Sequence, residues 1–472
     1  MGIEHPRADS PAVGRTVEAL IHDLAYGGAG VARVGGWVLM VPGAFPGERV
    51  TVHIRRKRKG LFEGDLLAVL ETSPDREPLA CPHASICGGC ALQGLSPLAQ
   101  TRWKNVQARE LLRRIGRVEP EIVEEPWSAP QPWFYRNKME FTFSRRPWIE
   151  KERLLAQGAP TGGPALGLHP RGLFSAVFDV DDCRLQSALS NAVVKAVRRA
   201  AVGRSLEAYD SRRDAGFLRH LVVRRPADES ELLIMLVARC DDPVLDAIAG
   251  EAAAEVPAVT GAVAAINTRR ATVAQGDYER PMLGDPCWHE SVAGVRFQIG
   301  ASSFFQIQAP GAEALVETAI AWLSPSRGDR ILDLYCGAGT FSLPLARRCA
   351  RVVGVESFAQ AVAQARENAA ANGIDAEFVC AEVEERGAPG WLEERWDAVL
   401  LDPPRSGLHP RALERLRAVG APRILYVSCN PATLARDTGL LTQEAGYLPR
   451  RLKVFDLFPQ TPHLESMLLL ER

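Results

Sequence analysis

The apolar residues in the last third of the chain fall into short runs separated by amphipathic segments. Such runs occur in RILDLYCG, RVVGVES, EFVCAEV, WDAVLLDPP and RILYVSCNP, between residues 330 and 431. Helical periodicity lies between them, and one helical segment stops at Asn372-Gly373, a typical helix C-cap. Strands that alternate with helices predict βαβ units, so we expect residues 301–472 to form an α/β domain with a largely parallel sheet covered on both faces.

Residues 13–72 show a different pattern, in which short β-type runs alternate with glycine turns. The runs TVEALIHDL, VARVGGWVLMVPG, ERVTVHIRR and LFEGDLLAVLE have the spacing of a small closed barrel. Five consecutive cations at residues 55–59 interrupt this region. They suit a groove that tracks phosphates, although a charge run is more often a solvated face.

Residues 73–300 mix both kinds of pattern. The strand-like pieces KMEFTFSRR, HLVVRR and LLIMLVAR follow a predicted helix at 98–116. This mixture predicts a central α+β domain. A chain of 472 residues is too long for one hydrophobic core, which agrees with a division at about residues 72 and 300.

The composition limits the class of protein. Hydrophobic content of 46% and charged content of 24% are ordinary for a folded chain, and a net charge of −1 does not by itself indicate nucleic-acid binding. MGIEHPRADS lacks the apolar core of a signal peptide, and no stretch approaches eighteen apolar residues. Ten cysteines then indicate reduced thiols, metal ligands or a nucleophile, so we expect a cytoplasmic protein with no membrane partner.

A nucleotide-type turn follows the first strand of the C-terminal region. In DLYCGAGTF the strand leads into Gly337 and Gly339, and Glu356 ends the next strand, where a carboxylate can accept ribose hydroxyls. The third glycine of a dinucleotide fingerprint is absent, which favours S-adenosylmethionine, a ligand without pyrophosphate. Asp402 ends a later strand, at the edge where α/β sheets bind ligands. A purely structural tight turn remains the alternative.

Cysteines occur in two further patterns that suggest chemistry. Cys81, Cys87 and Cys90 have C-x5-C-x2-C spacing, which supplies three ligands and needs a fourth. Zinc and iron–sulfur clusters both accept four thiolates, and the spacing by itself favours neither. Cys429 ends a strand, where a cysteine is either a small buried hydrophobe or a nucleophile.

Several motifs together resemble the RNA uracil-5 methyltransferase family. DLYCGAGTFSLPLA, VLLDPPRSG, YVSCNPATLARD and HLESM occur in the family's order, ASSFFQ and YRNKMEF match upstream, and residues 13–72 are similar to the OB-like, RNA-binding TRAM barrel. The resemblance implies a Rossmann-like class I fold that transfers a methyl group from S-adenosylmethionine to carbon 5 of a uridine in RNA, and we expect a monomer. Ribosomal RNA members carry both barrel and cluster, which favours 23S rRNA. A tRNA enzyme or a non-catalytic ribosome-assembly protein is the alternative.

The chemistry of this family needs a thiolate and a separate base. A thiolate adding to carbon 6 makes carbon 5 nucleophilic, and a base must later remove the carbon 5 proton. By resemblance, Cys429 is the nucleophile and Glu465 the base, and a [4Fe–4S] cluster is held by Cys81, Cys87, Cys90 and Cys183. The residues implied at the methyl donor are Gln306, Tyr335, Gly337, Glu356, Glu382 and Asp402. Phe304 and Phe305 are candidates for stacking on displaced bases, with core packing as the alternative.

Overall fold

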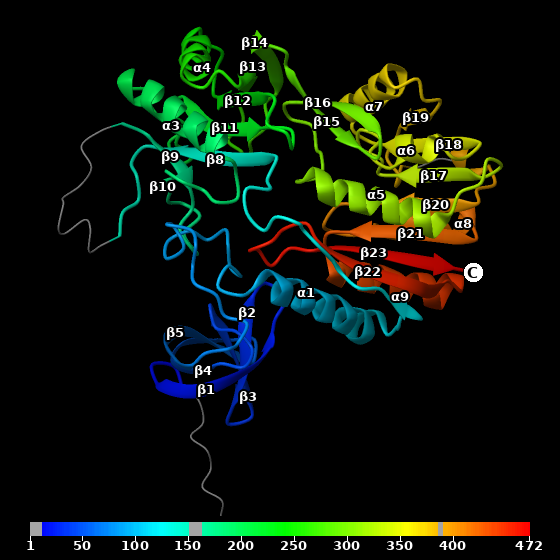
Figure 1. Ribbon diagram of the computed structural model, residues 1–472, viewed down its shortest axis with the longest axis horizontal. Helices are drawn as coiled ribbons and strands as arrows, with labels where there is room; N and C mark the ends of the chain where they lie inside the picture. The colour runs from blue at the N-terminus through cyan, green and yellow to red at the C-terminus, as the bar shows by residue number, and fades with distance from the viewer. Residues whose placement is uncertain (1–11, 151–162, 386–389) are drawn as a thin grey trace, which may run out of the picture.

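The computed structural model describes residues 12–150, 163–385 and 390–472. Over these residues the chain forms a closed five-stranded barrel, a seven-stranded sheet, a two-stranded hairpin and a nine-stranded sheet (Figure 1). None of the helices in these ranges is long and apolar enough to cross a bilayer. The predicted class, an α/β domain preceded by a barrel and a central α+β region, is confirmed. The division at residues 72 and 300 stays a prediction.

The barrel is built from alternating strands, as the sequence predicts. Its strands are β1 (Thr16–Leu24), β2 (Ala29–Val34), β3 (Trp37–Pro42), β4 (Arg49–Arg58) and β5 (Leu61–Glu71), closed in the order β1-β2-β3-β5-β4. Every second residue of β4 up to Ile54 is buried, and the cations that follow lie on the exposed end of the strand. Arg56 donates to Glu63 of β5 at 2.7 Å, so part of this charge is neutralised within the hairpin.

The central sheet is covered by a pair of helices. Its order is β10-β9-β8-β11-β12-β13-β14, with bounds β8 (Lys138–Ser144), β9 (Ala165–Leu168), β10 (Phe178–Asp179), β11 (Leu218–Arg224), β12 (Leu232–Ala238), β13 (Val259–Ile266) and β14 (Tyr278–Gly284). α3 (Ala188–Gly203) and α4 (Val244–Glu255) pack on it through one apolar core. The hairpin of β15 (Cys287–Val292) and β16 (Val295–Gly300) leads to the third part of the chain.

The nine-stranded sheet, here called the catalytic sheet, has the order β19-β18-β17-β20-β21-β23-β22-β6, with β7 also paired to β22. The strands are β17 (Arg330–Leu334), β18 (Arg351–Glu356), β19 (Glu377–Cys380), β20 (Ala398–Leu401), β21 (Arg423–Ser428), β22 (Leu448–Asp456), β23 (Glu465–Glu471), β6 (Ile122–Val123) and β7 (Trp127–Ser128). From β19 to β21 they are parallel, and β23 is antiparallel to β21. The largely parallel sheet is therefore as predicted.

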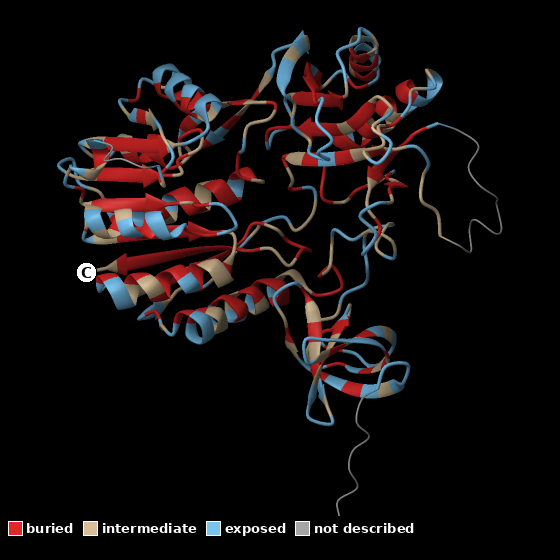
Figure 2. Cartoon of the chain, turned by 180° about the vertical axis from the view of Figure 1, so that it is seen from behind, coloured by how far each residue is buried: buried red, intermediate tan, exposed pale blue. Residues whose placement is uncertain are grey.

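Helices cover both faces of the catalytic sheet. They are α5 (Ala309–Leu323), α6 (Ser342–Ala346), α7 (Ala359–Ala371), the short η2 (Gly390–Leu392), α8 (Pro410–Val419) and α9 (Pro431–Ala445). Figure 2 shows the strands almost wholly buried and the helices exposing their outer faces. Buried apolar strands between two helical layers have the near-continuous hydrophobic pattern that the sequence displays.

One helix from the N-terminal half also belongs to this layer. α1 (Pro97–Leu111), continued by the π-helical turn η1 (Leu112–Gly116), packs against β22 and α9 (Figure 1). β6 and β7 then pair with β22. Residues 97–128 thus extend a sheet that is otherwise formed by the last third of the chain, an arrangement that the sequence pattern does not predict.

Candidate active site

The carboxyl ends of the parallel strands place the predicted residues at one edge of the catalytic sheet. Tyr335 follows β17, Glu356 ends β18, Asp402 follows β20 and Cys429 follows β21. Parallel strands end at a common edge, which is why residues far apart in sequence meet there. This edge opens into a cavity of about 1590 Å³, called here the shared cavity. That volume exceeds the range of a site for one small ligand and leaves room for a nucleotide as well.

All twelve residues predicted from the sequence line the shared cavity. They are Cys81, Cys87, Cys90, Cys183, Gln306, Tyr335, Gly337, Glu356, Glu382, Asp402, Cys429 and Glu465. The wall also contains side chains of the central sheet, such as Met139 and Phe178. The cavity therefore lies between the central and the catalytic sheets.

The glycine turn holds a carboxylate in a fixed place. Gly337 has φ +56° and donates its N–H to Glu356 Oε2 at 3.2 Å. Glu356 Oε1 accepts the N–H of Phe358 at 2.9 Å. Tyr335, at φ +65°, donates its hydroxyl to Glu384 Oε1 at 2.7 Å. The turn thus presents a carboxylate and a tyrosine ring to the cavity, which suits the ribose and base of a nucleoside.

Two buried carboxyl groups, Asp402 in this wall and Asp333 on β17, have raised pKa values. Burial raises the pKa of Asp402 to about 7. Burial likewise raises the pKa of Asp333 to about 7; the hydroxyl of Ser342 lowers it, and Asp402 and Glu356 raise it. Carboxylates that are desolvated and close to one another disfavour their own ionisation unless a cation is present. This end of the cavity is therefore complementary to a positively charged ligand.

Cys429 and Glu465 lie on neighbouring strand ends. Ser428, the last residue of β21, pairs with Ser466 of the antiparallel strand β23. Cys429, which follows Ser428, therefore lies beside Glu465, which precedes Ser466. Burial raises the pKa of the Cys429 thiol to about 11, with Glu465 and Asp402 adding to the rise. Burial and the charge of Asp402 also raise the pKa of Glu465 well above its usual value. The thiol of Cys429 and the carboxyl group of Glu465 thus lie side by side, near the part of the cavity that is complementary to a positively charged ligand.

Arg405 is a residue of this site that sequence reasoning missed. It lowers the pKa of both Cys429 and Glu465. Asn430, which caps α9 by accepting the N–H of Ala432 at 3.1 Å, donates its amide to the Arg405 carbonyl at 2.9 Å. The SCNP turn therefore holds the DPPRSG loop and places a cation near the thiol. The sequence signal for Arg405 was its position, three residues after Asp402 on a loop that follows a strand.

Tyr26, on the turn between β1 and β2 of the barrel, interacts electrostatically with the residues of this site. Partial burial raises the pKa of its hydroxyl, Cys429 and Glu465 raise it further, and Arg405 lowers it. The turn that carries Tyr26 packs against the loop before Glu465, since a Cβ at Gly28 would lie 3.6 Å from Pro462. The sequence offers no signal for this approach, because the contact joins opposite ends of the chain.

The ASSFFQ loop separates its two phenylalanines. Phe305 is buried against Trp288 and Phe297, at ring-centroid distances of 5.8 and 5.5 Å, so the core-packing interpretation holds for it. Phe304 is 73% exposed and lines the shared cavity, and it stays a candidate for stacking on a base. The backbone carbonyl of Gln306 accepts the Asn137 amide at 2.7 Å, which ties the loop to the YRNK segment.

The four predicted cysteine ligands line the shared cavity and influence one another electrostatically. All four are free thiols, and the pKa of Cys90 is raised by burial and then by Cys183, Cys87 and Cys81. Burial raises the pKa of Cys183 to about 11. Cys240 does not line this cavity. The donor set is that of an iron–sulfur cluster, but among the described residues no group of three or more His, Cys, Asp or Glu is arranged to hold a metal ion. The cluster therefore stays a prediction.

Comparison with known proteins identifies the family. The model of the TRAM domain matches residues 12–67, that of a methyltransferase domain residues 331–419, and that of tRNA (uracil-5-)-methyltransferase residues 392–472. An RNA methyltransferase of Halalkalibacterium halodurans is 33% identical over 459 residues, covering 96% of each chain. The chain belongs to the RNA uracil-5 methyltransferase family. Another relative, an RNA methyltransferase of Chlorobaculum tepidum, is 35% identical over 445 residues, covering 93% of this chain and 92% of its own.

A solved member of the RNA uracil-5 methyltransferases extends the likeness to the whole fold. It is the Pyrococcus abyssi tRNA (uracil-54, C5)-methyltransferase in complex with S-adenosyl-L-homocysteine, 28% identical with a TM-score of 0.72. The match covers 96% of this chain and 99% of that one. S-adenosylmethionine is thus the methyl donor of this class I enzyme. A tRNA enzyme matches almost the entire chain, barrel included, so the 23S rRNA substrate stays a prediction.

Proposed function

We propose that this methyltransferase acts through a covalent adduct between Cys429 and carbon 6 of a uridine, with Glu465 as the base that removes the carbon 5 proton. The observation that carries the proposal is the pairing of these two residues on adjacent strand ends, in the wall of the cavity that also contains Glu356 and Asp402. A nucleophile and a separate base beside a site for a cationic ligand meet the demands of the reaction.

The proposed reaction has three steps, and each can be assigned to residues of the cavity wall. The Cys429 thiolate adds to carbon 6, and Arg405 stabilises that thiolate, since it lowers the thiol's pKa. Carbon 5, now nucleophilic, forms a bond to the methyl carbon of S-adenosylmethionine. The sulfonium–methyl bond breaks, and S-adenosylhomocysteine leaves with that electron pair. The Glu465 carboxylate then accepts the carbon 5 proton, and the electron pair released restores the ring and expels the thiolate. Burial raises the pKa of both the thiol and the carboxyl group, so a cation in the cavity favours the ionised, reactive form of each.

The methyl donor is assigned to the acidic end of the shared cavity. Glu356 accepts the ribose hydroxyls, since the glycine turn fixes its carboxylate. Tyr335 and Gly337 form the wall beside the nucleoside. Gln306 and Asp402 lie in the same wall, and Glu382, an exposed residue after β19, is assigned to the adenine side.

Two RNA classes are candidates for the substrate. We propose 23S rRNA, as the resemblance to cluster-bearing members implies. The whole-chain likeness to a tRNA (uracil-54, C5)-methyltransferase favours tRNA as the second candidate. Mapping 5-methyluridine by mass spectrometry in rRNA and tRNA from a strain that lacks this gene decides between them, because only the substrate class loses the modification.

The four cysteines of the cavity wall are assigned to a [4Fe–4S] cluster. Four free thiols that line one cavity are the donor set that such a cluster takes. The proposed methyl transfer needs no electron, so the role of the cluster is to order the segments that carry Cys81, Cys87, Cys90 and Cys183. Iron content and visible absorbance of the purified protein test its presence independently of activity.

The variant Cys429→Ala tests the nucleophile. Methyl transfer to RNA should fall below detection, while binding of S-adenosylmethionine is retained, because Glu356 and Asp402 are unchanged. Cys380→Ala is the matched control, since it removes an exposed thiol outside the shared cavity. Measurable turnover by Cys429→Ala would end the assignment.

A further inference from the structure

The loop that precedes Glu465 determines where this carboxyl group lies. Residues 457–464 connect Asp456, the last residue of β22, with Glu465, the first residue of β23. The flanking residues Asp456 and Glu465 are buried. Within the loop, Leu457, Gln460 and Leu464 are buried as well. Any displacement of the loop therefore moves the start of β23 and the group on it.

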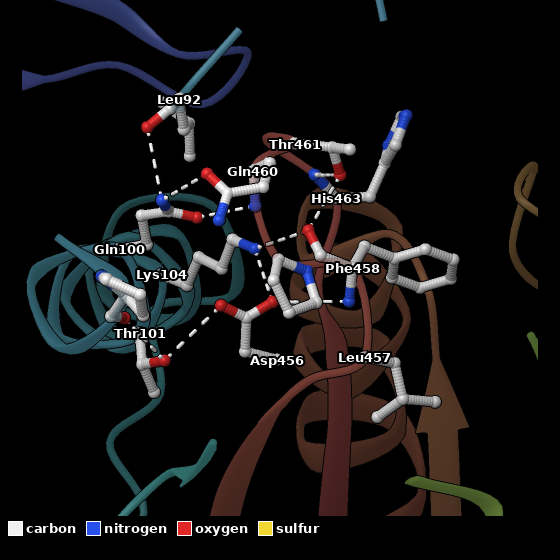
Figure 3. A network of polar contacts seen from close by, with 12 residues as sticks. Leu92, Gln100, Thr101, Lys104, Asp456, Leu457, Phe458, Gln460, Thr461 and His463 are labelled. Atoms are coloured by element: carbon white, nitrogen blue, oxygen red, sulfur yellow. Dashed lines mark hydrogen bonds and ion pairs between the residues drawn. The ribbon is translucent and has the colours of Figure 1, made fainter. Parts of the chain in front are cut away.

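One face of α1 holds this loop through buried polar side chains (Figure 3). Lys104 Nζ donates to Asp456 Oδ1 at 2.5 Å and to the Phe458 carbonyl at 3.1 Å. Thr101 donates its hydroxyl to Asp456 Oδ2 at 3.3 Å. Lys104 is 1% exposed. A buried ion pair of this kind often stabilises a fold no better than apolar residues would, so stability by itself does not account for its presence.

Gln100 joins the loop to the segment that follows Cys90. Its Oε1 accepts the Gln460 N–H at 2.6 Å, and its Nε2 lies 3.0 Å from Gln460 Oε1 (Figure 3). The same Nε2 lies 3.1 Å from the Leu92 carbonyl and 2.6 Å from that of Leu95. Leu92 in turn donates its N–H to the Gln460 carbonyl at 2.9 Å. One fully buried amide thus connects the cysteine segment, α1 and the loop before Glu465.

The backbone of the loop needs such support. Gln460 has φ +72°, a left-handed conformation that is costly for a residue other than glycine and persists where its surroundings enforce it. The Tyr135 hydroxyl also donates to the Pro459 carbonyl at 3.0 Å. The loop is therefore held in one conformation by contacts from outside it.

We propose that Gln100 is a positioning residue for proton removal: it fixes loop 457–464 against the segment after Cys90 and so sets the place of Glu465. The inference rests on the proposed role of Glu465 as the base. Addition of Cys429 and methyl transfer do not use Glu465, so loss of Gln100 should slow elimination more than the earlier steps. A misplacement of about 1 Å can cost roughly 10²-fold in rate.

The experiment compares Gln100→Leu with Gln107→Leu. Gln107 lies on the same helix and is also buried, but its amide donates to the Leu24 carbonyl at 2.8 Å, in the barrel. Each variant is incubated with RNA substrate and S-adenosylmethionine, and the covalent RNA–protein band is quantified on a denaturing gel. The expected result is a methylated adduct that accumulates in Gln100→Leu and not in Gln107→Leu, with S-adenosylmethionine affinity unchanged in both.

Glu465→Gln on the same gel separates the two hypotheses. A band in Glu465→Gln but not in Gln100→Leu overturns the positioning role and leaves the base intact. Equal bands in Gln100→Leu and Gln107→Leu overturn it as well, since any disturbance of α1 would then suffice. If Glu465→Gln gives no band, Glu465 is not the base, and the positioning role of Gln100 fails with it. If Gln100→Leu does not fold, Gln100→Met replaces it, because methionine matches glutamine in length but can neither accept the Gln460 N–H nor donate to the Leu92 and Leu95 carbonyls; absence of a band there is equally decisive.

Discussion

Binding of S-adenosylmethionine should release protons that binding of S-adenosylhomocysteine does not. S-adenosylmethionine carries a positively charged sulfonium, whereas S-adenosylhomocysteine carries a neutral thioether at the same place. Asp402 lines the shared cavity, and burial raises its pKa to about 7, so at pH 7 about half of these groups are protonated. A unit charge about 6 Å away, at an effective dielectric constant of about 20, contributes about 2.8 kcal/mol, or about two pKa units. The sulfonium would then lower the pKa of Asp402 to about 5 and ionise it at pH 7.

The sign and size of the effect follow from this change. A carboxyl group whose pKa falls on binding loses protons, so about half a proton should leave per S-adenosylmethionine bound at pH 7, and affinity should rise with pH between about 5 and 7. Isothermal titration calorimetry in phosphate and in Tris gives the number of protons from the dependence of the binding enthalpy on the buffer. The variant Asp402→Asn should remove most of the difference between the ligands. Equal proton release by both ligands would refute the reasoning.

Three further predictions concern residues around the cavity. Arg405→Gln should slow alkylation of Cys429 by iodoacetamide at pH 8, because Arg405 lowers the pKa of the thiol. The rate should fall roughly tenfold for each unit by which that pKa rises. An unchanged rate, measured by mass spectrometry of the Cys429 peptide, would contradict this. Cys183→Ser should lose the iron and visible absorbance that Cys240→Ser keeps; the reverse result would reassign the fourth ligand. Lys104→Met should lower the free energy of unfolding by about 3–5 kcal/mol in urea titrations, since it leaves a buried carboxylate unpaired. A loss below about 1 kcal/mol would mean that the pair is not buried in solution.

The sequence determined the parallel part of the fold and the edge where the ligand residues meet. Gly337, Glu356, Asp402 and Cys429 each follow or end an apolar run that a helix separates from the next. In a parallel sheet all such runs end at the same edge, so their order along the chain is enough to bring these side chains together. The barrel was likewise predictable from alternation, because all five of its strands lie within one short stretch of the chain, residues 16–71.

The tertiary structure decided which polar residues are buried and what they hold. The face of α1 that carries Gln100 and Lys104 has no apolar stripe, so its periodicity gives no sign that it packs on the catalytic sheet. Gln100 and Gln460 are 360 residues apart, and Tyr26 approaches Cys429 from the opposite end of the chain. A buried polar side chain is stabilised by its partner rather than by its local pattern, and that partner is known only once the distant segment has packed against it.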